Sequence, residues 1–128
     1  MIIYLDTSVV LKLVVEEKES VSAAEYLSAA TAQGHHLVAS MLVYTELHCA
    51  AHRRGFPAEL VNSVLAGINL VDVARSDLMY AAALPGRLRS ADAIHLAAAI
   101  RLQCDVLVAY DADLLAAAVE AGLNVRSP

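Results

Sequence analysis

The stretch "VLVAYDADLLAAAVEAGL", residues 106–123, contains the pattern that decides the fold. It opens with a short apolar run, places Asp111 and Asp113 close together, and then continues in a helix-like pattern. A short apolar run bounded by polar residues is typical of a strand that is buried on both faces, as in parallel sheets. The stretch therefore predicts a strand, a turn that carries two carboxylates, and a helix.

The same order of strand and helix recurs along the whole chain. Strands are expected at residues 2–5, 35–40, 68–73 and 106–110, with a short edge strand in 123–128. Helices are expected over residues 7–17, 19–34, 41–55, 57–67, 74–86, 90–103 and 112–122. This alternation predicts an α/β domain with a mainly parallel sheet of four to five strands. Thr7 or Ser8 is expected to cap the first helix, and Ser90 is expected to cap the helix at 90–103.

Composition limits the class of protein. The chain has 128 residues, a net charge of −5 and 59% hydrophobic residues, which suits one globular domain. No apolar stretch reaches the ~18 residues that span a bilayer, and "MIIYLD" carries no basic leader, so a cytoplasmic protein without membrane contact is expected. Cys49 and Cys104 are expected to be buried thiols in a reducing compartment.

Acidic residues are expected to gather at one edge of the sheet. Asp6 directly follows the first strand, and Asp111 directly follows the strand at 106–110. Asp92 lies in the first turn of a predicted helix, and Glu46 lies on the helix after the second strand. Since ligands bind beyond the carboxyl ends of the strands in open α/β sheets, these four segments would bring their carboxylates to one site.

Such a cluster requires a counter-charge. Two like charges at 4 Å repel by about 4 kcal/mol at an effective dielectric constant of 20. Either some of the acids are protonated, or a bound cation neutralises them. Because all the candidate ligands are oxygens, Mg²⁺ or Mn²⁺ is favoured over zinc. His95 lies one turn from Asp92 and is expected to be packed and hydrogen-bonded in preference to acting as a general base.

Four motifs resemble those of a known family. "IIYLDTSVVLKL", "ELHCAAHRR", "LRSADAIHLAAA" and "VLVAYDADLLAAAVEAGLNVRSP" are similar to the motifs of PIN-domain nucleases, and within them to the VapC toxins of toxin–antitoxin pairs. The resemblance runs from residue 2 to the C-terminus in the family's order. It implies a small α/β/α sandwich, with residues 1–128 forming a single PIN-like nuclease domain.

The resemblance also implies the roles of individual residues. The four acids of the family, which are catalytic and hold the metal, fall on Asp6, Glu46, Asp92 and Asp111. Asp113 matches a position that is acidic in only some members, and it is taken as a further metal ligand. The residues expected to contact the substrate are Thr7 or Ser8 through a hydroxyl, and Lys12, Arg87 and Arg89 through phosphates.

The implied activity is that of a Mg²⁺-dependent endoribonuclease, with Mn²⁺ as an alternative metal. A metal-activated water would hydrolyse RNA phosphodiester bonds and leave a 5′-phosphate and a 3′-hydroxyl. The implied partners are a VapB-like antitoxin and a second copy of the chain. The high apolar content independently suggests a surface covered by another subunit, for which residues 19–33 and the helix at 58–67 are candidates.

Three other readings remain open. A phosphatase that forms an aspartyl-phosphate would have a second Asp where Ser8 stands, and a receiver domain for phosphotransfer would have a lysine late in the chain, whereas none follows Lys18. A metal-dependent adhesion site would have a serine where Val10 stands. A non-catalytic, metal-binding PIN scaffold is the third reading, and the complete set of four acids argues against it.

Overall fold

The computed structural model describes residues 1–128 and contains one five-stranded sheet with the strand order β3-β2-β1-β4-β5. The strands are β1 (Ile2–Leu5), β2 (His36–Ser40), β3 (Asn69–Val71), β4 (Val106–Val108) and β5 (Val125–Arg126). Every neighbouring pair of strands is parallel. The predicted α/β class is therefore confirmed, and the sheet is parallel throughout.

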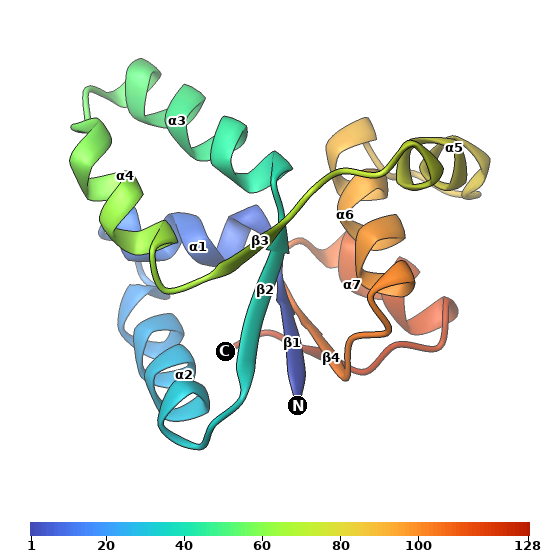
Figure 1. The fold of residues 1–128 in the computed structure, drawn as a ribbon, viewed down its shortest axis with the longest axis horizontal. Coiled ribbons are helices and arrows are strands. Elements are labelled where there is room, and N and C mark those ends of the chain that lie inside the picture. Colours follow the sequence, from blue (N-terminus) through green and yellow to red (C-terminus); the bar gives the residue numbers. More distant parts are fainter.

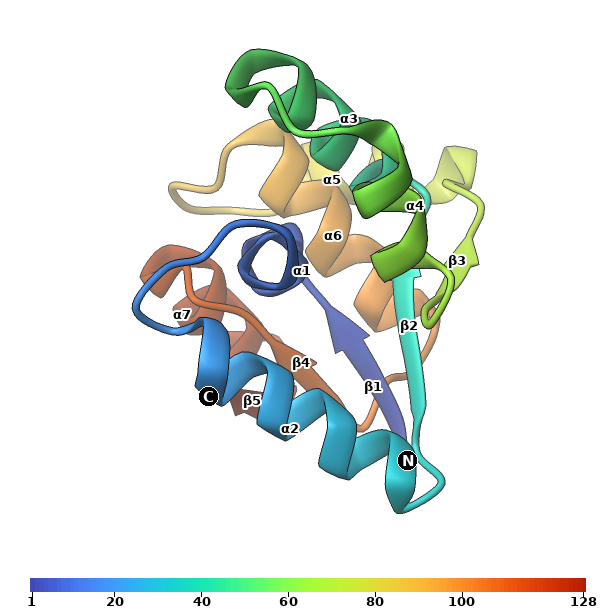
Figure 2. The same ribbon diagram turned by 90° about the vertical axis from the view of Figure 1, so that its left-hand side faces the viewer.

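Helices cover both faces of the sheet. They are α1 (Thr7–Val14), α2 (Ser20–Ala32), α3 (Leu42–Arg54), α4 (Ala58–Leu65), α5 (Arg75–Ala83), α6 (Ser90–Arg101) and α7 (Ala112–Glu120). Figure 1 shows α1 to α4 on one side of the strands and α5 to α7 on the other. The view in Figure 2 has α1, α2 and α4 in front of the sheet. This is the expected α/β/α sandwich, and none of its helices is long and apolar enough to cross a bilayer.

The central strand β1 explains why the strands read as continuous apolar runs. Ile3 and Leu5 belong to the larger core cluster, which packs against α1 to α4. Tyr4, between them, belongs to a second cluster together with Leu96 of α6 and Leu114 of α7. Because successive side chains of a strand point to opposite faces, a strand covered by helices on both sides needs an apolar residue at every position.

The caps of two helices differ from the prediction. Asp6 caps α1: its backbone is extended and its carboxylate accepts the N–H of Ser8, whereas Thr7 and Ser8 are already helical. The chain leaves β1 and enters α1 with no linking residue except Asp6, so Asp6 alone can hold the cap position. Arg89 precedes α6 without a side-chain cap, and Ser90 is the first residue of that helix.

Some element ends are earlier than predicted. The strand expected at 68–73 is shorter and comprises only Asn69–Val71 (β3), and the helix expected at 7–17 ends at Val14. The helix expected at 74–86 ends at Ala83, because Leu84 has an extended backbone before Pro85, as residues that precede proline usually do.

The two cysteines have different environments. Cys104 is buried, as predicted, but Cys49 is exposed, so that prediction was wrong. The buried face of α3 is formed by Val43, Leu47, Ala50 and Ala51. Cys49 occupies the opposite face of that helix, which the apolar composition of the segment does not reveal.

The strand order places the predicted acids near one another. β1 and β4 are neighbours at the centre of the sheet, and the N–H of Asp6 donates to the carbonyl of Val108 at 3.0 Å. Asp6 and Asp111 therefore follow adjacent strands at the same edge. The next strand on the other side of β1 is β2, after which α3 begins and carries Glu46.

Candidate active site

Asp6 and Asp111 are both held as helix caps. Oδ2 of Asp6 accepts from the N–H of Ser8 at 3.1 Å and from the hydroxyl of Ser8 at 2.6 Å. Oδ1 of Asp111 accepts from the N–H of Leu114 at 2.8 Å. Both side chains thus satisfy backbone N–H groups at the start of a helix, α1 for Asp6 and α7 for Asp111. Each carboxylate thus uses one oxygen for its cap and keeps the other free of hydrogen bonds.

The hydroxyl of Ser8 connects the two loops that carry these acids. It donates to Asp6 and accepts from the N–H of Tyr110, the residue before Asp111, at 3.0 Å. The loop after β4 is therefore fixed to the start of α1. In this structure the hydroxyl predicted to meet the substrate is occupied in positioning Asp6.

Glu46 lies on α3 and is partly buried. Its Oε1 accepts from the hydroxyl of Thr7 at 2.7 Å and lies 2.7 Å from Nε2 of His95. Burial acts to raise the pKa of Glu46, but the hydrogen bonds from His95 and Thr7 outweigh it and hold that pKa below its ordinary value. Glu46 is therefore ionised at neutral pH, and Thr7, like Ser8, serves to position a carboxylate.

Asp92 lies in the first turn of α6, where the negative charges of the other acids affect its pKa. Burial, followed by the negative charges of Asp6 and Asp111, raises the pKa of Asp92 to about 6. The charge of Glu46 acts in the same direction. The four acids thus come from four different segments and share one electrostatic site, as the sequence predicted.

Asp113 is two residues from Asp111, in the first turn of α7. It is exposed on α7 and lines a cavity of about 200 Å³ together with Arg87. Its role as a metal ligand stays a prediction.

The donor chemistry of the site fits a hard divalent cation. Every candidate ligand is a carboxylate oxygen, and Mg²⁺ and Mn²⁺ prefer such ligands. The acids give the site an excess of negative charge, which together with burial raises the pKa of Asp92. A bound cation would neutralise this charge. In this structure no three acidic, histidine or cysteine side chains are already drawn together as a metal-binding cluster. The site thus has the ligands and the charge, and its carboxylates would have to close around the ion.

Comparison with known proteins identifies the family. The family model described as "PIN domain" matches residues 3–120. The chain belongs to the PIN domain family. It is 35% identical to "Ribonuclease VapC47" of Mycobacterium tuberculosis (strain CDC 1551 / Oshkosh), over 98% of this chain and 96% of that protein. The predicted resemblance to VapC-type PIN nucleases is confirmed, and the chain is a nuclease, a hydrolase.

Solved structures share the fold of this PIN domain. VapBC2 from Rickettsia felis, bound to a DNA fragment from its promoter, aligns with a TM-score of 0.75, 18% identity and 98% coverage of both chains. A toxin–antitoxin complex from Klebsiella pneumoniae aligns with a TM-score of 0.69 and 20% identity, over 88% of this chain and 89% of that one. At such identities the likeness concerns the fold alone.

The three basic residues predicted to contact phosphate, Lys12, Arg87 and Arg89, differ in their surroundings. The ammonium group of Lys12 pairs with Glu17 and, at 3.1 Å, with Glu19, and it lies 5.4 Å from the ring centre of Tyr110. Its charge is therefore already neutralised, and it is not free for a phosphate. Arg87 and Arg89 are exposed in the loop that leads into α6, just before Asp92, and they make no ion pair. These two remain the candidates for phosphate contact.

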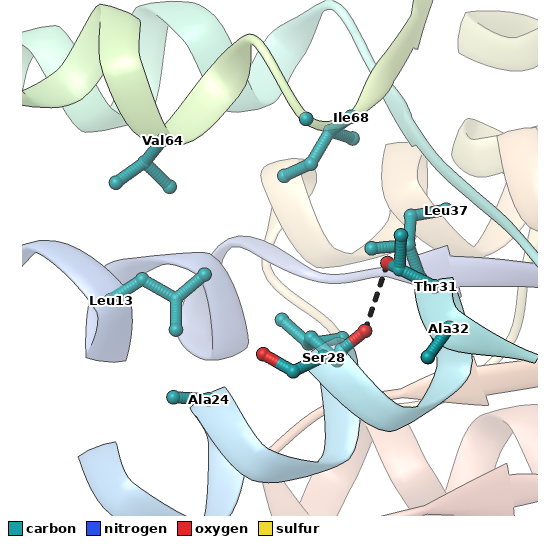
Figure 3. A pocket seen from close by; sticks show the side chains of 10 residues that line it. Leu13, Ala24, Ser28, Thr31, Ala32, Leu37, Val64 and Ile68 are labelled. Atoms are coloured by element: carbon teal, nitrogen blue, oxygen red, sulfur yellow. Dashed lines mark hydrogen bonds between the residues drawn. The ribbon is translucent and has the colours of Figure 1, made fainter.

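An apolar groove lies in the helical layer formed by α1 to α4 (Figure 1), and none of the four acids lines it. It has a volume of about 500 Å³ and runs between the end of α1, α2 and α4. Figure 3 shows side chains that line it, including Leu13, Ala24, Val64 and Ile68. The hydroxyl of Thr31, at one end, is satisfied by its own helix through Leu27 at 2.9 Å. The two helices predicted to carry a contact face, α2 and α4, form its walls.

One residue of the site has a role that the sequence did not indicate. Tyr4 is buried in β1, and its hydroxyl accepts the N–H of Ser40 at 3.1 Å and contacts Nδ1 of His95 at 2.8 Å. The available signal was a tyrosine in a strand buried on both faces, because a buried tyrosine hydroxyl needs a hydrogen-bond partner.

The raised pKa of Asp92 predicts how the metal-free protein responds to pH. The folded protein holds this proton up to about pH 6, whereas the unfolded chain releases it near 3.8. Stability should therefore fall as pH rises between these values. The full shift would be about 3 kcal/mol, and since the carboxyl is partly exposed we expect about 1 kcal/mol. Urea unfolding in EDTA at several pH values, for the wild type and Asp92→Asn, measures the difference; identical pH profiles would contradict it.

Proposed function

We propose that this PIN domain, comprising residues 1–128, is a Mg²⁺-dependent endoribonuclease that acts as the toxin of a VapBC-type pair. The observation that carries the proposal is the shared electrostatic site of Asp6, Glu46, Asp92 and Asp111. Asp6, Glu46 and Asp111 each keep one carboxylate oxygen that makes no hydrogen bond. The relative VapC47, which is 35% identical to this chain, is named a ribonuclease, and this supports RNA as the substrate.

The four carboxylates would hold Mg²⁺, or Mn²⁺ in its place. When bound, the ion supplies Lewis-acid polarisation of a phosphoryl oxygen and lowers the pKa of a water. Asp92 would be held ionised by a bound cation, because the cation would relieve the repulsion that raises its pKa. Thr7 and Ser8 hold Glu46 and Asp6 in place through their hydroxyls. Arg87 and Arg89 bind the phosphates that flank the cleaved bond.

Incubation of the purified chain with single-stranded and hairpin RNA tests the proposal. We expect cleavage in Mg²⁺ or Mn²⁺, products with a 5′-phosphate and a 3′-hydroxyl, and complete loss of cleavage in EDTA, because the acids alone cannot activate water. Mapping of the RNA ends measures both points. Undiminished cleavage in EDTA, or products with cyclic phosphates, would contradict the metal-dependent mechanism. Binding of Mn²⁺ without any cleavage would identify a non-catalytic scaffold.

The partner in this proposal is a VapB-like antitoxin. Structures with the same fold include a toxin–antitoxin complex, which supports this kind of partner. We assign its apolar anchoring segment to the groove between α1, α2 and α4, because the walls there are aliphatic and not used by the acidic site (Figure 3). A short reading frame for a DNA-binding protein directly upstream of the gene is the expected genomic arrangement. A cytoplasmic homodimer completes the proposal, and sedimentation of the purified chain measures its oligomeric state.

A further inference from the structure

His95 is completely buried at the base of the acidic site, with 0% of its surface exposed. Its two ring nitrogens have different partners. Nδ1 lies 2.8 Å from the hydroxyl of Tyr4, and Nε2 lies 2.7 Å from Oε1 of Glu46 and 3.0 Å from the hydroxyl of Thr7. The imidazole thus joins a buried core tyrosine to one of the four acids.

The direction of the hydrogen bond at Nδ1 follows from Tyr4. Its oxygen accepts the N–H of Ser40, and burial raises the pKa of Tyr4 well above its ordinary value, so the hydroxyl keeps its proton. A buried hydroxyl without an acceptor is costly, and Nδ1 of His95 is the acceptor within reach. Tyr4 therefore donates to Nδ1. Since a neutral imidazole has one donor and one acceptor, the hydrogen resides on Nε2.

The hydrogen on Nε2 determines how Glu46 is held. Nε2–H donates to Oε1 of Glu46, which also accepts from the hydroxyl of Thr7. Both hydrogen bonds thus converge on one oxygen of the carboxylate. The other oxygen, Oε2, makes none and is available to a cation or a water.

We propose that Ser40, Tyr4 and His95 form a positioning relay that fixes the Nε2–H tautomer of His95 and thereby holds Glu46 with Oε2 free for the metal. The inference rests on the proposed function insofar as Glu46 serves as a ligand. Tyr4 and His95 are positioning residues in this scheme, because they act through Glu46 and not on the substrate. Partners of metal ligands commonly affect metal affinity by about 10–100-fold.

The tautomer is tested first, in the metal-free protein, by ¹⁵N NMR of the histidine rings. We expect the signal of His95 to show an unprotonated Nδ1 and a protonated Nε2. Tyr4→Phe removes the donor to Nδ1, and we expect it to shift His95 toward a mixture of tautomers. A wild-type His95 with its hydrogen on Nδ1, or an unchanged tautomer in Tyr4→Phe, would overturn the relay.

Two matched substitutions then separate positioning from packing. The amide nitrogen of Gln matches the place of Nε2 and keeps a donor to Glu46. The amide oxygen of Asn can take the place of Nδ1, so His95→Asn keeps an acceptor for the hydroxyl of Tyr4 but has no donor that reaches Glu46. We expect His95→Asn to weaken Mn²⁺ binding by about 10-fold or more, and His95→Gln to retain most of the affinity. Titration calorimetry measures the affinities, and urea unfolding measures the stability of both variants. Equal affinities in the two variants would overturn the proposal even if both are destabilised.

These outcomes are distinct from failure of the proposed function. A wild type that binds Mn²⁺ but cleaves no RNA removes the nuclease assignment and leaves the relay supported by the NMR and affinity results. A wild type that binds no Mn²⁺ removes the relay's role toward the cation. An Nδ1–H tautomer in an active nuclease removes the relay alone.

Discussion

Asp92→Asn is expected to lower RNA cleavage by at least about 100-fold while the protein stays folded, because loss of a direct ligand should exceed the 10–100-fold effect of outer partners. Asp92 makes no hydrogen bond that the fold needs, and its pKa is raised by burial and by its acidic neighbours. Replacing it with a neutral amide therefore removes repulsion from the metal-free protein while removing one ligand. Initial rates of RNA cleavage in Mg²⁺ measure the loss.

Asp6→Asn provides a second test at the same site. Asn caps helices about as well as Asp, so α1 should retain its cap while the free oxygen Oδ1 of Asp6 is lost as an anionic ligand. Glu25→Gln is the matched control, because Glu25 is exposed on α2, a helix that carries none of the four acids. Full activity in Asp92→Asn or Asp6→Asn would reject the assignment. A comparable loss in Glu25→Gln would show that the assay reports general charge effects.

Arg101→Met is expected to destabilise the fold by about 3 kcal/mol, the size of effect seen when one partner of a buried ion pair is removed. Asp77 of α5 is buried, with 2% of its surface exposed, and both of its oxygens accept from Arg101 of α6, at 2.7 and 3.0 Å. The hydrogen bonds from Arg101 hold the pKa of Asp77 below its ordinary value against the effect of burial. Without Arg101 the carboxylate would remain buried and unpaired.

Urea unfolding at neutral pH measures this loss. The double variant Asp77→Asn with Arg101→Met is the control, because it removes the buried charge together with its partner while Asn can still accept the N–H of Ala74. We expect the double variant to be more stable than Arg101→Met alone. Strictly additive effects would show that the pair does not couple α5 to α6. The pair matters for function because α6 carries both Asp92 and His95.

Elements with strong local signals were predicted well. Gly55, predicted to close the helix at 41–55, has a left-handed backbone at the end of α3, a conformation that glycine adopts readily. Asp111 lies in the turn between β4 and α7, as the stretch at 106–123 indicated, although β4 ends at Val108, two residues earlier than the strand predicted at 106–110. Where the backbone turns at the end of an element, the decisive interactions lie within a few residues, and the sequence displays them.

Roles that depend on partners far along the chain were predicted less well. Lys12 was expected to contact phosphate, but its ammonium group forms ion pairs with Glu17 and Glu19, because the chain folds back between α1 and α2. Thr7 was expected to meet the substrate, but its hydroxyl donates to Glu46 of α3. A single sequence shows which groups are available, whereas the partner that each one meets depends on how the helices pack.

The amino-acid sequence by itself determined the α/β class and the order of the strands and helices along the chain, and it predicted that Asp6, Glu46, Asp92 and Asp111 gather at one edge of the sheet. These features depend on hydrophobic periodicity and on residues adjacent to strand ends, which are local properties. Only the tertiary structure decided that Asp113 and Arg87 line the same cavity and that His95 joins Tyr4 to Glu46. Tyr4 and His95 are 91 residues apart in the chain, and only the packing of α6 against the sheet brings their hydrogen-bonding groups together.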